Sequence, residues 1–278
     1  LSIIRNLYEH PEELPRLSAL RAGGGLGDPI SVPYLVEMAT STIGLGSRLD
    51  ALDMLKHMPQ DYRIETGLRP LLDSDDLEVR LRTAETLAFR NDPIIKKFTI
   101  NKKFDLVLVP SQHNMVYVTQ TGWPQIILTG NIEIERPLTL SAWSNRLLIK
   151  ELADNPDMLE VRYRDNESQT TVNEIITPDL PTFTMFLAHR PTPESPAPGL
   201  NLSYSRTLGA IHALWREEYL NADFKVEQDR LLAVIQRLAR ETTYTPRPDF
   251  GDDSESTDGS RYMKEPTPIA TEDQESIQ

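Results

Sequence analysis

The sequence predicts an α+β protein in which a helical repeat array is followed by a β-rich region, a short helical segment and an acidic tail. Two observations lead to this fold class. The dipeptide Arg-Leu recurs at residues 16, 48 and 80, a spacing of 32 residues, and after Pro93 the apolar residues change from helical spacing to short runs typical of strands. The expected domains are 1–95 (helical repeats), 96–177 (β-rich), 178–240 (helical) and 241–278 (tail).

The 32-residue period predicts three pairs of antiparallel helices between residues 2 and 92. Asp28-Pro29-Ile30 and Asp92-Pro93-Ile94 lie two periods apart, where one unit would end and the next begin. In the third unit we expect one helix from Gly67 to Leu72, and residues 73–76 offer the N-cap of the following helix. Each helix of a pair can bury only one face, so neighbouring units must stack to close the core.

The β-rich region contains six runs of β-branched and apolar residues separated by turn formers. The runs are 105–109, 115–119, 125–129, 145–149, 158–163 and 170–176. They predict a small antiparallel sheet or sandwich of about five or six strands.

Helical spacing returns after Pro178, with apolar residues on one face up to Leu187. A Pro-rich linker, 191–199, precedes a helix that Ser203 would cap. Its expected apolar stripe is Tyr204, Leu208, Ile211, Trp215 and Tyr219. A last helix would carry Leu231, Val234, Ile235 and Leu238.

The formal net charge is −13, and residues 241–278 hold ten acidic side chains against three basic ones. This tail has few large apolar groups, so we expect it to be disordered. The remaining chain is also negative and has no basic stripe, which argues against a nucleic-acid partner. No run approaches the roughly 20 apolar residues of a membrane span. The chain starts at Leu1 without an initiator Met, so we expect further sequence upstream, where a signal peptide would lie.

No set of residues has the spacing of a catalytic, cofactor-binding or metal-binding site, so none is expected. The absence of cysteine excludes disulfides, thiolate metal ligands and a cysteine nucleophile. The five histidines are scattered without a partner at helical spacing: His10, His57, His113, His189 and His212. We expect His189 to help satisfy the carbonyls at the end of its helix.

Several local patterns have a functional and a structural interpretation, and the structural one is favoured for each. Residues 23–27 are glycine-rich but lack the order of a phosphate loop, so a turn between repeats is expected. Asp249-Phe250-Gly251 matches a kinase tripeptide without the other kinase motifs. Asp252, Asp253 and Glu255 lack the spacing of a calcium loop and are interpreted as a solvated charge run.

Serines and tryptophans offer weaker signals. Ser111 and Ser203 lie outside any nucleophile-elbow motif. Trp143 and Trp215 are both candidate recognition anchors, although Trp215 is expected in the core because it lies on a helical stripe. Trp123, between Gly122 and Pro124, is the best candidate for an exposed contact.

The third unit, Leu77 to Ala88 followed by Asp92-Pro93, resembles HEAT-type repeats. Together with Met115 to Thr119 and the run from Trp123 to Gly130, it resembles flagellar basal-body P-ring proteins of the variant that carries HEAT-like repeats. The resemblance covers residues 1–240, while the ring-building domain of that family has no counterpart in this chain.

The resemblance implies a non-catalytic structural subunit of the periplasmic ring around the flagellar rod, supporting motility without a cofactor. It implies protein partners, namely other basal-body subunits and further copies of the full-length protein. One alternative is a cytoplasmic HEAT-repeat adaptor that binds a protein or peptide. A second, from the enzyme class, is a HEAT-scaffold lyase acting on a chromophore.

Overall fold

The computed structural model describes residues 1–42, 44–165, 170–230 and 232. Within this part the protein is mixed α+β, as predicted, with nine helices and two small sheets. The last predicted helix and the acidic tail, 241–278, lie outside the described residues.

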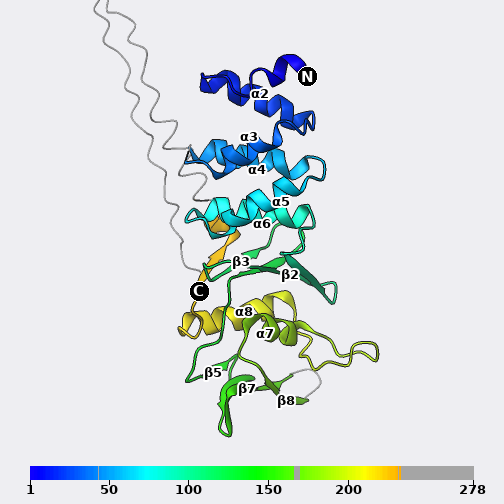
Figure 1. The fold of residues 1–278 in the computed structure, drawn as a ribbon. Helices are drawn as coiled ribbons and strands as arrows, with labels where there is room; N and C mark the ends of the chain where they lie inside the picture. The colour runs from blue at the N-terminus through cyan, green and yellow to red at the C-terminus, as the bar shows by residue number, and fades with distance from the viewer. Residues whose placement is uncertain (43, 166–169, 231, 233–278) are drawn as a thin grey trace, which may run out of the picture. The chain divides into compact units, whose positions relative to one another are not determined.

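The N-terminal part is helical (blue to cyan in Figure 1). Its helices are α1 (Ser2–Arg5), α2 (Glu13–Gly25), α3 (Val32–Thr40), α4 (Leu45–His57), α5 (Tyr62–Leu68), the 3-10 helix η1 (Arg69–Asp73) and α6 (Leu77–Phe89). Helices α2, α4 and α6 are each 13 residues long. They begin at residues 13, 45 and 77, so the 32-residue period of the sequence is also the spacing of these helices.

The ends of α2 and α6 have the same geometry, two periods apart. Gly27 and Asn91 both take positive φ, 67° and 57°. The next residue, Asp28 or Asp92, donates its backbone N–H back into the last helical turn over 2.9 Å. This left-handed cap is a standard way to satisfy helix C-terminal carbonyls. Pro59 stands at the middle position, and its ring restricts φ to negative values, so α4 ends without this cap.

The predicted helix from Gly67 to Leu72 is wrong in its boundaries. Helix α5 already starts at Tyr62, and the segment continues after Leu68 as η1. Pro70 lies at the start of η1 and lacks the N–H that an α-helix needs. The next prediction is confirmed, because the Asp76 side chain caps α6 by accepting from the backbone N–H groups of Glu78 and Val79.

The first sheet has five strands in the order β1-β2-β4-β3-β9. The strands are β1 (Lys96–Ile100), β2 (Phe104–Val109), β3 (Met115–Thr119), β4 (Gln125–Thr129) and β9 (Asp223–Val226). The expectation of an antiparallel sheet is wrong here, because β2 pairs with β4 and β3 with β9 in parallel. Strands β2, β3 and β4 are buried on both faces, which explains their continuous apolar runs.

The second sheet is antiparallel, with the order β5-β6-β7-β8. Its strands are β5 (Thr139–Ala142), β6 (Leu147–Leu152), β7 (Asn155–Arg164) and β8 (Thr171–Ile176). Two helices follow, α7 (Leu180–Ala188) and α8 (Tyr204–Arg216). Ser203 caps α8, as predicted, by accepting from the Arg206 backbone N–H.

The expected apolar stripe of α8 is confirmed except at Trp215, because Ile211 is buried and Tyr204, Leu208 and Tyr219 pack half-buried against the core. The buried residues are Thr207, Ala210, Ile211 and Leu214. Trp215 was expected in the core, but its side chain is 37% exposed and packs against His212 and Phe224. The segment 178–240 was expected to be helical, yet it also contains strand β9, which continues the first sheet beyond β3.

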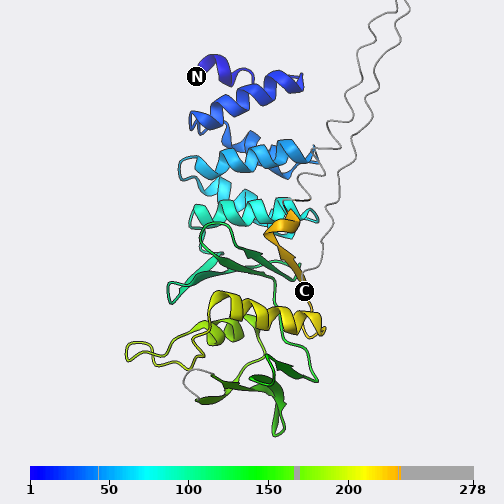
Figure 2. The same cartoon turned by 180° about the vertical axis from the view of Figure 1, so that it is seen from behind.

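Residues 1–226 form layers joined by two hydrophobic cores (Figures 1 and 2). One core lies between the helices and one face of the first sheet, which contributes Val107, Met115 and Tyr117. The other core joins the opposite face of that sheet to α7, α8 and the second sheet. The helical region and the first sheet therefore share a core. None of the described helices is long and apolar enough to cross a membrane.

Candidate protein-binding site

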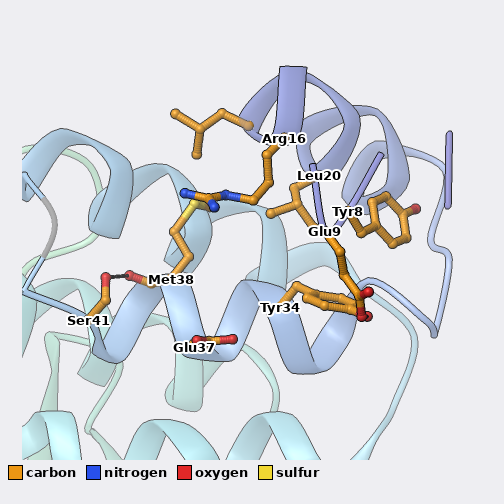
Figure 3. A pocket seen from close by; sticks show the side chains of 9 residues that line it. Tyr8, Glu9, Arg16, Leu20, Tyr34, Glu37, Met38 and Ser41 are labelled. Atoms are coloured by element: carbon orange, nitrogen blue, oxygen red, sulfur yellow. Dashed lines mark hydrogen bonds between the residues drawn. The ribbon is translucent and has the colours of Figure 1, made fainter. Parts of the chain in front are cut away.

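A pocket of about 250 Å³ opens on the helical region, where α2 begins and α3 ends (Figure 3). It is lined by Tyr8, Glu9, Arg16, Leu17, Leu20, Tyr34, Glu37, Met38 and Ser41. Tyr8, Leu20 and Met38 are buried, whereas Glu9 and Glu37 are exposed. The pocket therefore combines an apolar interior with charged groups at its edge.

Tyr8 forms one wall and is held from behind by a buried carboxylate. Its hydroxyl donates a 2.9 Å hydrogen bond to Asp28, which also accepts two hydrogen bonds of 2.9 Å from the guanidinium of Arg5. The bonds from Arg5 lower the pKa of Asp28 to about 2, and burial raises the pKa of Tyr8 to about 12. Across the ordinary pH range, Asp28 is thus charged and Tyr8 is neutral.

The glycine at residue 23 makes room for this wall. A Cβ atom there would lie 2.0 Å from the Tyr8 hydroxyl oxygen, so any larger residue would displace the ring. Gly23 to Gly25 form the last turn of α2, where the sequence had suggested a turn between repeats. Within the glycine-rich run, Gly27 is the residue that takes positive φ.

Tyr34 of α3 forms the second aromatic wall. Its ring centroid lies 5.7 Å from that of Tyr8, and its hydroxyl donates a 2.6 Å hydrogen bond to Glu9. This bond raises the pKa of the Tyr34 hydroxyl. The two rings are fixed by hydrogen bonds to separate carboxylates, so the pocket has a preformed shape. A preformed pocket favours binding because its side chains lose little conformational freedom when a ligand binds.

Arg16 is the one basic residue that lines the pocket. At the equivalent repeat positions, Arg48 donates to the Ala39 carbonyl near the end of α3, and Arg80 donates to the Ser74 carbonyl after η1. The Arg16 side chain, in contrast, makes no hydrogen bond or ion pair within the described residues. In Figure 3 its side chain runs toward Met38. The guanidinium is therefore available to a carbonyl or carboxylate oxygen of a bound segment.

The predicted site residues are spread over the molecule. The five histidines lie on different segments, and no group of three metal-ligating side chains occurs in the described part of the chain. A ring nitrogen of His189 lies 3.2 Å from the Ser195 carbonyl, not at the carbonyls of α7 as expected. The Ser111 hydroxyl donates to the Leu72 carbonyl, linking the first sheet to η1.

Trp123 is 48% exposed, as predicted for a contact residue, while a contact partner for it stays a prediction. Trp143 packs edge-on against Tyr163, with ring centroids 6.3 Å apart. Asp249 to Gly251, and the acidic run after it, lie outside the described residues.

Sequence reasoning missed Arg5, Tyr8 and Tyr34. A usable signal was present, because Arg5 precedes Asp28 by 23 residues and Arg69 precedes Asp92 by the same interval. The repeated Asp-Pro step marked the unit boundary but did not reveal that each aspartate has an arginine partner. Tyr8 and Tyr34 gave no such signal, since no other unit has tyrosine at these positions.

Comparison with known proteins identifies no family: no protein-family model and no curated protein matches the chain.

Proposed function

We propose that the chain is a non-catalytic structural protein that presents binding surfaces to other protein chains. The observation that carries this proposal is the use of charged residues in the helical region. The two buried aspartates, Asp28 and Asp92, are held by arginines from preceding helices. Arg82 contacts Asp53 of the neighbouring unit over 2.6 Å. These ion pairs connect different helical segments, so the charged residues stabilise the structure.

We further propose that the three helical units are HEAT-like repeats. Support comes from the 32-residue spacing of α2, α4 and α6 and from the repeated cap after α2 and α6. In such arrays each unit contacts its neighbours, and the continuous surface along the stack binds partners. The pocket at Arg16 lies on this surface and has the size of one or two side chains, so it would take an anchor from a bound segment.

The particular role we propose is that of a component of the flagellar basal body, in the periplasmic P-ring. It rests on the resemblance of residues 77–88 and 115–130 to P-ring proteins that carry HEAT-like repeats. In this role the chain would contact other basal-body subunits and further copies of the full-length protein. The helices and sheets share cores, so they would act as one rigid attachment rather than as flexibly linked modules.

The genetic test is an in-frame deletion of the coding region for residues 1–240 in the source organism. We expect loss of swimming and basal bodies with an incomplete ring in electron micrographs, both restored by the intact coding region. A strain that expresses Arg16→Gln separates binding from folding, because this partly exposed side chain makes no hydrogen bond or ion pair within the described residues. Normal motility and intact rings in the deletion strain would refute the flagellar role.

The alternative is a cytoplasmic HEAT-repeat adaptor. The pocket at Arg16 supports this alternative as well as the flagellar role, because a pocket that binds a peptide segment fits both. The two functions differ in location. An adaptor would be recovered with the cytoplasmic fraction, and its deletion would leave the basal body unchanged.

A further inference from the structure

The outer face of the second sheet is open to solvent and carries a cluster of arginines. In the pairing register, Ser141, Leu148, Arg162 and Asn173 form one row across the four strands. Arg164 pairs with Thr171, and its backbone N–H donates to the carbonyl of Arg146, so Arg146 and Arg164 belong to the adjacent row. Side chains two residues apart on a strand share a face, which places all three arginines on this one.

These arginines line a cavity of about 420 Å³ together with Ser141, Asn145 and Leu148. The Arg162 side chain is exposed and makes no hydrogen bond or ion pair within the described residues. The pKa of the nearby Glu160 is lowered by the hydrogen bond from Lys150 and also by the charge of Arg162. Arg146 donates its Nε to the Trp143 carbonyl, and its two terminal nitrogens have no partner in the same part of the chain. Two guanidinium groups therefore have donors available.

The turn between β5 and β6 fixes Arg146 in this position. Trp143, Ser144 and Asn145 all have positive φ, at 55°, 58° and 64°. Each such non-glycine residue costs about 1 kcal/mol of backbone strain. The turn directs Trp143 toward Tyr163 and α8 in the core, while the Trp143 carbonyl accepts from Arg146. Strain of this kind tends to be retained where a binding geometry depends on it.

The charge of this face is opposite to that of the chain. Among the described residues of its four strands and the Arg146 position, it carries four basic side chains, Arg146, Lys150, Arg162 and Arg164, and one acidic side chain, Glu160, which pairs with Lys150 over 2.8 Å. The whole chain has a net charge of −13. At physiological salt, charges interact over about 8 Å. A short ligand would experience the local positive charge, whereas a long polyanion such as a nucleic acid is disfavoured by the net negative charge of the protein.

We propose that this face binds an acidic segment of a partner protein. Its carboxylates would accept hydrogen bonds from Arg162 on β7 and from the terminal nitrogens of Arg146, just before the neighbouring strand β6. Guanidinium groups suit this role because they bind carboxylates through two parallel hydrogen bonds. The inference does not depend on the flagellar assignment.

The test uses the full chain and a fluorescein-labelled peptide with three glutamates alternating with serines, measured by fluorescence anisotropy. We expect saturable binding at about 50 mM NaCl that weakens as salt rises. The same peptide with glutamines should not bind. Arg162→Gln and Arg146→Gln should each weaken binding by about ten-fold, the size of one lost charge-assisted bond.

The matched control is Arg216→Gln, the same change at an exposed arginine of α8 that pairs with its neighbour Glu217. It should bind like the wild type, and circular dichroism should show all variants folded. The proposal is overturned if the wild type shows no saturable binding, if Arg216→Gln weakens binding as much as Arg162→Gln, or if the glutamine peptide binds equally well. Tighter, Arg162-dependent binding of a single-stranded oligonucleotide would also overturn it, in favour of phosphate ligands.

Discussion

The guanidinium of Arg69 donates two hydrogen bonds, of 3.1 and 3.0 Å, to the carboxylate of Asp92, whose side chain is fully buried. The same pair occurs 64 residues earlier as Arg5 and Asp28. In both cases the aspartate also accepts the backbone N–H two residues later. Each aspartate follows the end of a helix, and its carboxylate contacts both the backbone after the next proline and an arginine 23 residues earlier in the chain.

Replacing Asp92 with asparagine should lower the free energy of unfolding by about 2 kcal/mol, because a buried charge pair loses one partner while the shape is kept. Urea denaturation measures this. The control is Asp50→Asn, at a carboxylate that is 46% exposed and pairs with Arg21, where the change should stay below about 0.5 kcal/mol. Equal losses in the two variants would contradict the special role of the buried pair.

The depressed pKa of Asp28 predicts a specific pH dependence of stability. Its pKa falls from an ordinary 3.8 to about 2 on folding, so its contribution is complete above about pH 4 and is lost as pH falls toward 2. Asp28→Asn should therefore be less stable than the wild type at neutral pH, with a gap that narrows between pH 4 and 2. Thermal unfolding across this range tests it. A gap that is constant with pH would show that Asp28 does not titrate with the fold.

Gly67 should resist substitution although it lies in a helix. A Cβ atom there would lie 2.5 Å from Cγ1 of Val36 on α3, and overpacking of about 1–3 kcal/mol should exceed the helix-propensity gain of about 1 kcal/mol. Gly67→Ala should thus destabilise, and adding Val36→Ala should recover part of the loss. In α4, Gly46 has nothing within 4 Å, so Gly46→Ala should stabilise. Stabilisation by both alanines would contradict the close packing of α5 on α3.

Arg230 attaches the segment after β9 to α6. It donates to Glu78 over 2.8 to 3.1 Å and to Glu85 over 2.7 Å. Removing it leaves two partly buried carboxylates without this cation, so Arg230→Ala should destabilise by about 2–3 kcal/mol. Hydrogen exchange at Phe224 and Val226 of β9 should accelerate as well. The control is Arg216→Ala, the same change at an exposed arginine of α8. Exchange in Arg230→Ala that is no faster than in this control would indicate that β9 is held by strand pairing alone.

Sequence reasoning predicted the central elements because their burial is visible in the chain. The 32-residue period identified α2, α4 and α6, and six apolar runs correspond to β2, β3, β4, β6, β7 and β8. The three strands it missed, β1, β5 and β9, are four or five residues long and exposed or half-buried over most of their length. Strand β1, for example, starts with Lys96 and Lys97. They give no apolar run because little of each strand is buried, whereas β8, which also lies at a sheet edge, is six residues long and was predicted.

The candidate site was harder to predict for a different reason. Tyr8 and Tyr34 come from different segments, and each is unremarkable in its own sequence context. Arg16 was noted only as a member of the Arg-Leu repeat, which does not indicate a pocket. In the next unit, Arg48 donates to the Ala39 carbonyl, whereas the Arg16 side chain has no such acceptor within the described residues. This difference is a property of the folded structure and is not visible in the sequence. The arginines of the second sheet were equally hidden, because strand register determines that Arg146 and Arg164 share a face.

The most direct test of the proposed structural role is the location of the protein in the cell. We would purify hook–basal bodies from the source organism and quantify peptides of residues 1–230 by mass spectrometry, with periplasmic and cytoplasmic fractions in parallel. The account predicts enrichment in the basal-body preparation at a constant ratio to rod subunits. Recovery in the cytoplasmic fraction, with no enrichment in basal bodies, would contradict it and support the adaptor instead.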